Sequence, residues 1–194
     1  IVPVEVPQRR GDPILIEHDE GMRPGTTPDS LGNLRAAFLD EGTVTAGNAS
    51  QISDGAAALV IADRDAAQAL GMPVIAEILA YGQTAGPDTS LQAQPANALH
   101  IALKKADLDV TDLDLVEINE AFAAVALYSA NLLGIPHDRV NVNGGAIALG
   151  HPLGASGARI VVTLISALKA RGGGIGGAAL CGGGGQGDAL IVKV

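Results

Sequence analysis

The sequence is poor in aromatic residues and lacks tryptophan. Aromatic residues make up 2% of its 194 residues, and the 47% hydrophobic content comes mostly from Ala, Val, Leu and Ile. Small side chains of this kind favour closely layered packing, which is typical of α/β folds. No apolar run approaches the roughly 18 residues of a membrane-spanning helix, and no repeat with a period of about 20 to 50 residues is evident. We therefore expect a globular chain without a membrane partner.

Basic residues are scarce as well. Twelve Lys and Arg face 21 Asp and Glu, which gives a formal net charge of −9, and no basic cluster interrupts this surplus. This charge disfavours nucleic acid as a partner. One cysteine cannot form an internal disulfide, and four scattered histidines do not resemble a zinc site, so we expect a reducing, cytoplasmic compartment and no bound metal. Because the sequence begins at Ile1 without methionine, we expect the natural N-terminus to lie upstream, and any targeting signal with it.

The periodicity of apolar residues predicts alternating strands and helices after an irregular, proline-broken start. Residues 26–38 resemble a capped amphipathic helix, and residues 43–50 a strand tip that ends in a turn. Residues 54–62 form a continuous run of small apolar residues, which is typical of a strand buried on both faces. The other expected elements are helices at 66–70, 95–106, 121–132 and 158–168 and strands at 73–78, 113–118, 140–142, 176–181 and 189–194. Ser156 is the expected N-cap of the helix at 158–168.

Three chain segments each present one polar group where a strand or loop ends. Asn119 follows one predicted strand, Cys181 ends another, and His151 lies in a glycine-bounded loop before a helix. Because ligands bind at the C-terminal edge of open α/β sheets, these side chains are candidates for one site. Taken singly, Asn119 is more typical of a helix N-cap, and Cys181 of an inert core residue. Glycine N–H groups or an imidazole beside Cys181 would lower its pKa toward neutrality and fit the thiol for proton transfer.

The glycine-rich turn after Cys181 does not fit a nucleotide-binding motif. Gly182, Gly184 and Gly187 match G-x-G-x-x-G, but a strand rather than a helix follows them. No Gly-Lys-Ser/Thr follows either, so a P-loop is excluded. Glycines at this position instead let a substrate approach the backbone and leave N–H groups free to bind a developing negative charge.

Three motifs together resemble the C-terminal signature set of the thiolases. They span 119–123, 144–159 and 181–187, and the similarity extends over nearly the whole chain. The resemblance implies a layered α-β-α-β-α arrangement of two similar halves, with a mixed five-stranded sheet in the C-terminal domain. The implied domains are residues 1–52 for the remainder of the CoA-binding loop domain, 53–74 for the last segment of the N-terminal domain and 75–194 for the C-terminal domain.

The resemblance also implies roles for single residues. It indicates an acetyl-CoA acyltransferase of fatty acid metabolism, which condenses two acyl-CoA molecules reversibly or cleaves a 3-oxoacyl-CoA. In the family pattern His151 activates the nucleophilic cysteine and helps form an oxyanion hole for the thioester enolate, and Asn119 holds a water that completes this hole. Cys181 takes or returns the α-proton, and the N–H of Gly183 belongs to a second oxyanion hole. The implied CoA contacts are Ser50, Arg23, Ala46, Phe122 and Leu34, and CoA thioesters are substrates, with no separate cofactor.

The chain departs from the family pattern in its cysteine content. A thiolase uses two cysteines, and the nucleophilic one lies in the N-terminal half, whereas Cys181 is the one cysteine here. The resemblance therefore implies about the C-terminal half of the enzyme, which we expect to be inactive alone, to pair with the missing half and to form a homodimer or homotetramer. Two alternatives stay open: a non-catalytic module that binds CoA or acyl groups, and a less favoured Cys/His/Asn hydrolase with Cys181 as its nucleophile.

Overall fold

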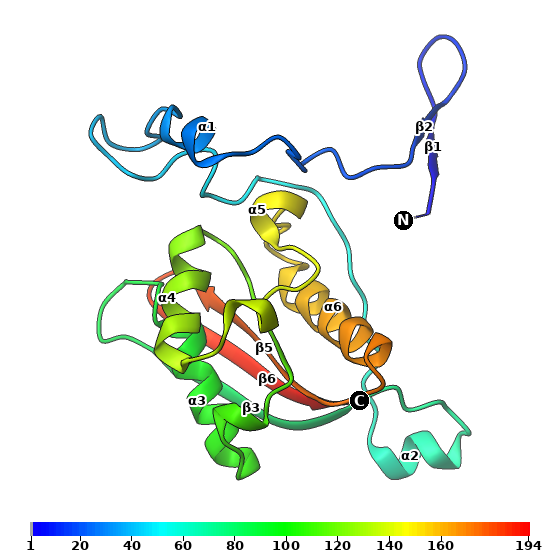
Figure 1. The fold of residues 1–194 in the computed structure, drawn as a ribbon. Helices are drawn as coiled ribbons and strands as arrows, with labels where there is room; N and C mark the ends of the chain where they lie inside the picture. Colours follow the sequence, from blue (N-terminus) through cyan, green and yellow to red (C-terminus); the bar gives the residue numbers. More distant parts are fainter. Residues whose placement is uncertain (1) are drawn as a thin grey trace.

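The computed structural model describes residues 2–194, and its centre is a mixed sheet (Figure 1). The strands lie in the order β3 (Glu77–Ala85), β6 (Gln186–Lys193), β5 (Ile175–Gly182) and β4 (Leu115–Ile118). β4 and β5 run parallel, whereas the other neighbouring strands are antiparallel. Parallel neighbours need a crossover, and the chain between β4 and β5 accordingly carries helices.

Helices cover both faces of this sheet. α3 (Gln94–Ala106) and α4 (Ala123–Leu133) lie on one face and α6 (Ser156–Ala170) on the other (Figure 1). The buried aliphatic residues form one cluster on each side. Small residues permit close packing: a Cβ at Gly82 in β3 would overlap the backbone of Ala98 in α3. The predicted α/β class and mixed sheet are confirmed, and this chain forms one α-β-α unit of the layered arrangement.

In the part of the chain that the structure describes, this sheet has four strands rather than the five expected. The segment at 140–142 makes only an isolated parallel bridge, between Val140 and Val116 of β4. The Asn141 side chain continues the pairing, because its Oδ1 accepts from the N–H of Ile118 and its Nδ2 donates to the Ile118 carbonyl, both at 2.8 Å. Asn141 has a φ of 49°, which turns the chain away from an extended path.

Residues 2–70 lie mostly outside the sheet. β1 (Val4–Val6) and β2 (Ile14–Ile16) form a small antiparallel hairpin apart from it (Figure 1). α1 (Pro28–Gly32) begins at a capping box between Thr27 and Ser30. It ends at Gly32, so the helix expected to reach residue 38 is shorter than predicted, since glycine is a poor helix former. α2 (Arg64–Ala69) agrees with the helix predicted at 66–70.

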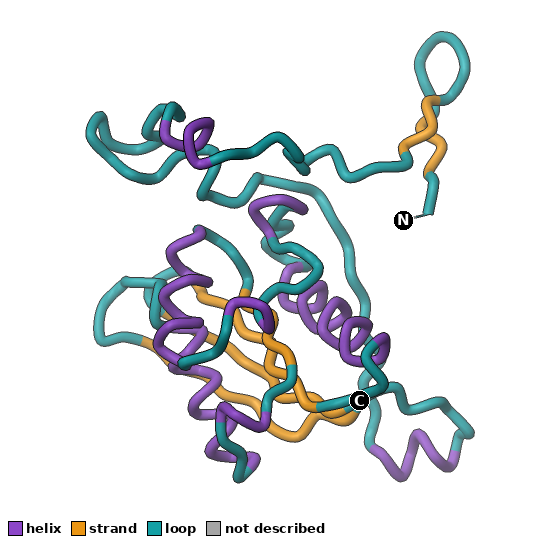
Figure 2. The backbone as a smooth tube through the Cα atoms, in the orientation of Figure 1, coloured by secondary structure: helices purple, strands orange, loops and turns teal. Residues whose placement is uncertain are grey.

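The strand expected at 54–62 is wrong within this chain. These residues form an extended connection without strand pairing (Figure 2). Val60 is 84% exposed and Ile61 72% exposed. An apolar run forms a buried strand only where a neighbouring strand receives its backbone hydrogen bonds, and no described residue does so here. Residues 43–50 likewise make isolated bridges in place of a strand.

The remaining elements lie close to their predicted positions. The strand predicted at 73–78 begins at Glu77 and continues to Ala85, and the β5–β6 hairpin is confirmed. Gly184 and Gly185 in its turn have φ values of 85° and 78°, which glycine adopts at little cost. Short helices complete the chain: η1 (Val110–Asp112), η2 (His137–Arg139) and α5 (Ala146–Leu149). None of the helices described in residues 2–194 has the length and apolar character needed to cross a bilayer.

Candidate active site

The predicted site lies where β4 and β5 end side by side. Ile118 of β4 is in register with Ala179 of β5, and the N–H of Asn119 donates to the Ala179 carbonyl at 2.9 Å. Asn119 is 1% exposed. The N-cap interpretation of Asn119 is wrong, because α4 begins at Ala123 and Phe122 occupies its N-cap position. The Asn119 side chain therefore does not cap α4 and can make other hydrogen bonds at the sheet edge.

Glu120 fastens the loop that carries His151 to the end of β4. Its carboxylate accepts from the N–H of Ile147 in α5 at 3.1 Å and from the Asn141 side chain at 3.0 Å. Gly145 packs so closely against this carboxylate that a Cβ there would overlap it. The glutamate and glycine of two predicted motifs thus fit each other directly.

Residues 48–52 run between the Asn119 turn and the His151 loop. Ser50 donates from both its N–H and its hydroxyl to the Ala121 carbonyl, at 3.2 and 3.1 Å. The carbonyl of Gln51 accepts from the N–H of His151 at 3.2 Å. The structure therefore places Ser50, one of the predicted CoA contacts, next to the candidate site.

Both ring nitrogens of His151 have polar partners. Nε2 lies 3.2 Å from Nδ2 of Asn119, and Nδ1 lies 2.6 Å from Oγ of Ser156. Ser156 is not the N-cap of α6, since it is the first helical residue and Ala155 holds the cap position. Its hydroxyl is instead a hydrogen-bond partner of the imidazole. Burial, together with the nearby Arg159 charge, lowers the pKa of His151, so the ring is neutral at pH 7.

A buried ion pair lies behind Asn119. Nη2 of Arg159 donates to Oδ1 of Asn119 at 3.3 Å, and Nη1 lies 3.7 Å from Oε2 of Glu117. Glu117 is 2% exposed. Burial raises the pKa of Glu117 to about 7, and this effect outweighs the opposing attraction of Arg159, while the charge of Glu120 adds to the rise. The site thus holds a carboxyl that titrates near neutrality.

Glu117 and Arg159 were not predicted from the sequence as site residues. The available signal was a single carboxylate in the otherwise apolar strand at 115–118, which must find a partner when buried. Arg159 stands eight residues after His151 in the same motif, but its partner could not be read from spacing. The role of Ser156 was missed because a serine before a helix is also typical of a cap.

Cys181 lies at the end of β5, at the same sheet edge as Asn119. It is half-buried, packs against the apolar cluster on the α3–α4 side, and makes no hydrogen bond to His151 among the described residues. Burial raises the pKa of this thiol. The expected lowering toward neutrality is therefore wrong for this chain by itself, because burial outweighs the one opposing effect, a backbone hydrogen bond that lowers the pKa.

The other predicted site residues differ in their surroundings. Gly183 is exposed in the β5–β6 turn with open space around it, and Phe122 packs against the α3–α4 cluster. Arg23 is exposed and donates to two backbone carbonyls of its own turn, at 2.7 and 3.1 Å. Leu34 and Ala46 lie in the irregular segment before Ser50. No described hydrogen bond joins these last three to the sheet edge.

A groove of about 430 Å³ adjoins the His151 loop, lined by residues 53–57 and 152–155. Within residues 2–194 no group of three or more His, Cys, Asp or Glu side chains is placed to hold a metal ion. The described site therefore offers a neutral imidazole, an amide and a thiol, which together can move protons and bind a developing negative charge.

Two family models match this chain. The model described as Thiolase, C-terminal domain, matches residues 72–194, and the one described as Thiolase, N-terminal domain, matches residues 1–65. The chain belongs to the thiolase family. The predicted domain limits at residues 52 and 74 stay a prediction, as do the roles of the single site residues.

The relatives of this thiolase chain are about twice its length. The probable acetyl-CoA acetyltransferase of Mycobacterium tuberculosis (strain ATCC 25618 / H37Rv) is 57% identical over 193 residues, which cover 100% of this chain and 49% of that protein. The crystal structure of the Bacillus anthracis acetyl-CoA acetyltransferase is 41% identical with a TM-score of 0.89, covering 100% of this chain and 49% of that one. Human mitochondrial 3-ketoacyl-CoA thiolase in complex with CoA is 41% identical with a TM-score of 0.85, covering 98% and 47%. This thiolase chain spans about half the length of the curated relatives it matches.

Proposed function

We propose that this chain supplies the C-terminal half of an acetyl-CoA C-acyltransferase. The enzyme condenses two acyl-CoA molecules reversibly or cleaves a 3-oxoacyl-CoA with CoA, and the other half contributes the nucleophilic cysteine. The observation that carries the proposal is the contact between Asn119 and His151 at the ends of β4 and β5, 3.2 Å long and largely shielded from solvent. It joins residues of two thiolase motifs, Asn119 and His151, which are 32 residues apart in the sequence.

The proposed chemistry requires a base and donors aimed at an oxyanion. Removing an α-proton from a thioester produces an enolate, which is unstable unless preorganised donors bind its charge. Neutral His151 takes the proton of the nucleophilic cysteine and then donates from the same nitrogen to the enolate oxygen, and a water held by Asn119 is the second donor. Cys181 exchanges the α-proton, and the N–H of Gly183 binds the oxyanion of the tetrahedral intermediate.

The chain alone lacks a second thiol, and we propose that it does not transfer acyl groups by itself. Covalent acyl transfer needs a nucleophile as well as the base, and Cys181 is a half-buried thiol with a raised pKa. Contact with the other half removes solvent from this edge and brings new polar groups, which would change the ionisation of Cys181.

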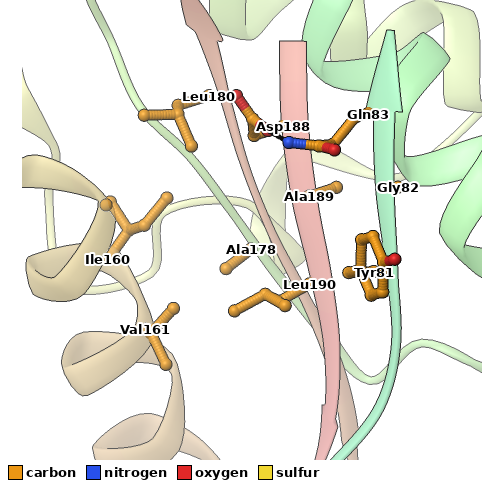
Figure 3. A pocket seen from close by; sticks show the side chains of 11 residues that line it. Tyr81, Gly82, Gln83, Ile160, Val161, Ala178, Leu180, Asp188, Ala189 and Leu190 are labelled. Carbon is orange, nitrogen blue, oxygen red and sulfur yellow. Dashed lines mark hydrogen bonds between the residues drawn. The ribbon is translucent and has the colours of Figure 1, made fainter. Parts of the chain in front are cut away.

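The surface where we place the other half includes a groove between α6 and the β3–β6 side of the sheet. The groove has a volume of about 330 Å³ and is lined by Ile160 and Val161 of α6, Tyr81 of β3 and Leu190 of β6. Figure 3 shows Ile160 and Val161 on α6, Leu190 pointing toward them from β6, and Tyr81 on the neighbouring strand β3. Tyr81 is 58% exposed, and so large an apolar opening favours burial against another polypeptide. Acyl-CoA substrates and assembly into a homodimer or homotetramer belong to the same proposal.

Reconstitution tests this function. The half of the Mycobacterium tuberculosis relative that this chain does not match is co-purified with the 194-residue chain, and thiolysis of acetoacetyl-CoA is followed as loss of its enolate absorbance. We expect activity from the pair and its loss in His151→Ala and Cys181→Ser pairs. A stable pair that binds CoA without any turnover would instead support the alternative, a non-catalytic CoA-binding module, which the raised pKa of Cys181 favours.

A further inference from the structure

We propose that Ser156 and Arg159 are positioning residues that hold His151 in a single tautomer, with the proton on Nδ1 and the lone pair on Nε2. The use of this tautomer in catalysis rests on the proposed function. The tautomer itself follows from the directions in which five hydrogen-bonding groups at this site can donate and accept.

On the Nδ1 side of the ring lies Ser156, which is fully buried. Its hydroxyl lies 3.0 Å from the Pro152 carbonyl, which can only accept, so the one hydroxyl proton is directed there. Oγ of Ser156 must then accept at its 2.6 Å contact with the imidazole. Nδ1 of His151 therefore carries the proton.

On the Nε2 side of the ring lie Asn119 and, behind it, Arg159. The guanidinium of Arg159 can only donate, so the atom of Asn119 that lies 3.3 Å from it is the amide oxygen. This fixes the orientation of the amide, and its NH₂ group lies 3.2 Å from Nε2 of His151. An NH₂ group donates, so Nε2 must accept and carries no proton. The partners on the two sides of the ring require the same tautomer, although they have no group in common except the imidazole.

This arrangement also fixes the orientation of the ring. Rotation by 180° about the Cβ–Cγ bond would replace each ring nitrogen by a carbon and lose both hydrogen bonds. The neutral ring thus presents a lone pair on Nε2, which is the form that can accept a proton from a cysteine. The carboxyl of Glu117 lies 3.7 Å from Arg159, the residue that orients Asn119, and so helps to hold the guanidinium in place.

NMR of the 194-residue chain labelled with 15N-histidine tests this proposal. The 15N chemical shifts and the long-range 15N–1H correlations of an imidazole report directly which nitrogen is protonated. At pH 7.5, roughly one unit above the ordinary histidine pKa, we expect His151 to show the Nδ1–H pattern. The exposed His18, His100 and His137 serve as internal references. An Nε2–H pattern for His151 in the unmodified chain overturns the proposal.

Ser156→Ala removes the acceptor of the Nδ1 proton, and we expect loss of the Nδ1–H pattern in favour of Nε2–H or a mixture. In this variant the Pro152 carbonyl still accepts hydrogen bonds from the N–H groups of residues 155 and 156, at 2.8 and 2.9 Å, so the local fold is retained. Ser129→Ala is the matched control, since this buried hydroxyl donates to the Gln92 carbonyl at 2.7 Å and does not contact the imidazole. An unchanged His151 pattern in Ser156→Ala contradicts the role of Ser156.

Arg159→Met keeps the aliphatic stem but removes the donor to Asn119, and we expect a mixture of tautomers. Arg159→Lys retains a donor and is expected to recover part of the Nδ1–H population. If Arg159→Met leaves His151 unchanged, the role of Arg159 is wrong. None of these NMR measurements needs a substrate, so they are independent of the activity assay. A fixed tautomer without acyl transfer in the reconstituted pair would refute only the proposed function. Acyl transfer with a mixed tautomer would refute only the present inference.

Discussion

Arg159 and Glu117 form an ion pair that lacks a hydrogen bond. Nη1 and Oε2 lie 3.7 Å apart, and neither atom has a hydrogen-bond partner among the described residues. A buried carboxylate that is only partly compensated is costly in its charged form, which is why burial raises the pKa of Glu117 to about 7. The interior behind Asn119 therefore changes its charge within the physiological pH range.

Glu117→Gln is expected to reduce the pH dependence of stability. The unfolded carboxyl has a pKa of 4.5 and the folded one about 7, so between these values the folded state binds more protons. Stability then falls as pH rises from about 4.5 to about 7 in the unmodified chain, and this fall is absent in the variant. Urea unfolding at pH 5 and pH 8 measures the difference between the two chains.

The difference between the chains isolates this carboxyl from other titrating groups. The lowered pKa of His151 acts with the opposite sign, because the unfolded imidazole binds a proton first and stability is lost as pH falls below about 6.5. This contribution is present in both chains and cancels in the comparison. A gap between the two stabilities that stays constant from pH 5 to pH 8 would show that Glu117 is ionised throughout.

Gly145→Ala is expected to disturb the His151 loop. The added Cβ would overlap the carboxylate of Glu120, which holds α5 through the N–H of Ile147. Overpacking at such a contact costs on the order of 1–3 kcal/mol. Gly154→Ala, in the same loop with open space around it, is the matched control. Thermal unfolding of both variants checks this, and equal melting temperatures would mean that Glu120 moves aside freely.

Cys181 is expected to react slowly with iodoacetamide near neutral pH. The thiol is half-buried and its pKa is raised by that burial, so little thiolate is present at pH 7. The alkylation rate of the 194-residue chain, followed by mass spectrometry, should lie below that of free cysteine. It should also continue to rise with pH above the ordinary pKa of a thiol. Alkylation of the folded chain at pH 7 as fast as that of free cysteine would contradict the described environment.

Much of the sheet and its helices could be predicted from the sequence, because apolar residues recur there with clear periods. The helix at 95–106 and the strand at 113–118 are examples, and both depend on neighbours within this chain. The run at 54–62 has an equally clear pattern but forms no strand, since a strand needs a partner that no described residue provides. Periodicity thus predicts an element only together with its partners.

The site was predictable in its motifs but not in its contacts. Sequence reasoning identified Asn119, His151 and Cys181, yet it favoured a capping role for Asn119 and assigned one to Ser156. Both choices rest on the capping rule. The actual partner of Asn119 is distant, since Arg159 lies 40 residues away, and the partner of Ser156 is five residues away across a loop whose path the sequence does not reveal. Long-range hydrogen bonds leave no periodic trace, so the groups that orient His151 emerge only from the three-dimensional structure.

The thiolysis rate of acetoacetyl-CoA, measured for the purified chain before and after addition of its N-terminal half, tests the central claim most directly. We expect no enzymatic rate from the 194-residue chain alone and a rate that appears with the added half and requires Cys181. Cleavage of acetoacetyl-CoA at an ordinary enzymatic rate by the chain alone would contradict the account, because Cys181 would then have to act as nucleophile without a second thiol.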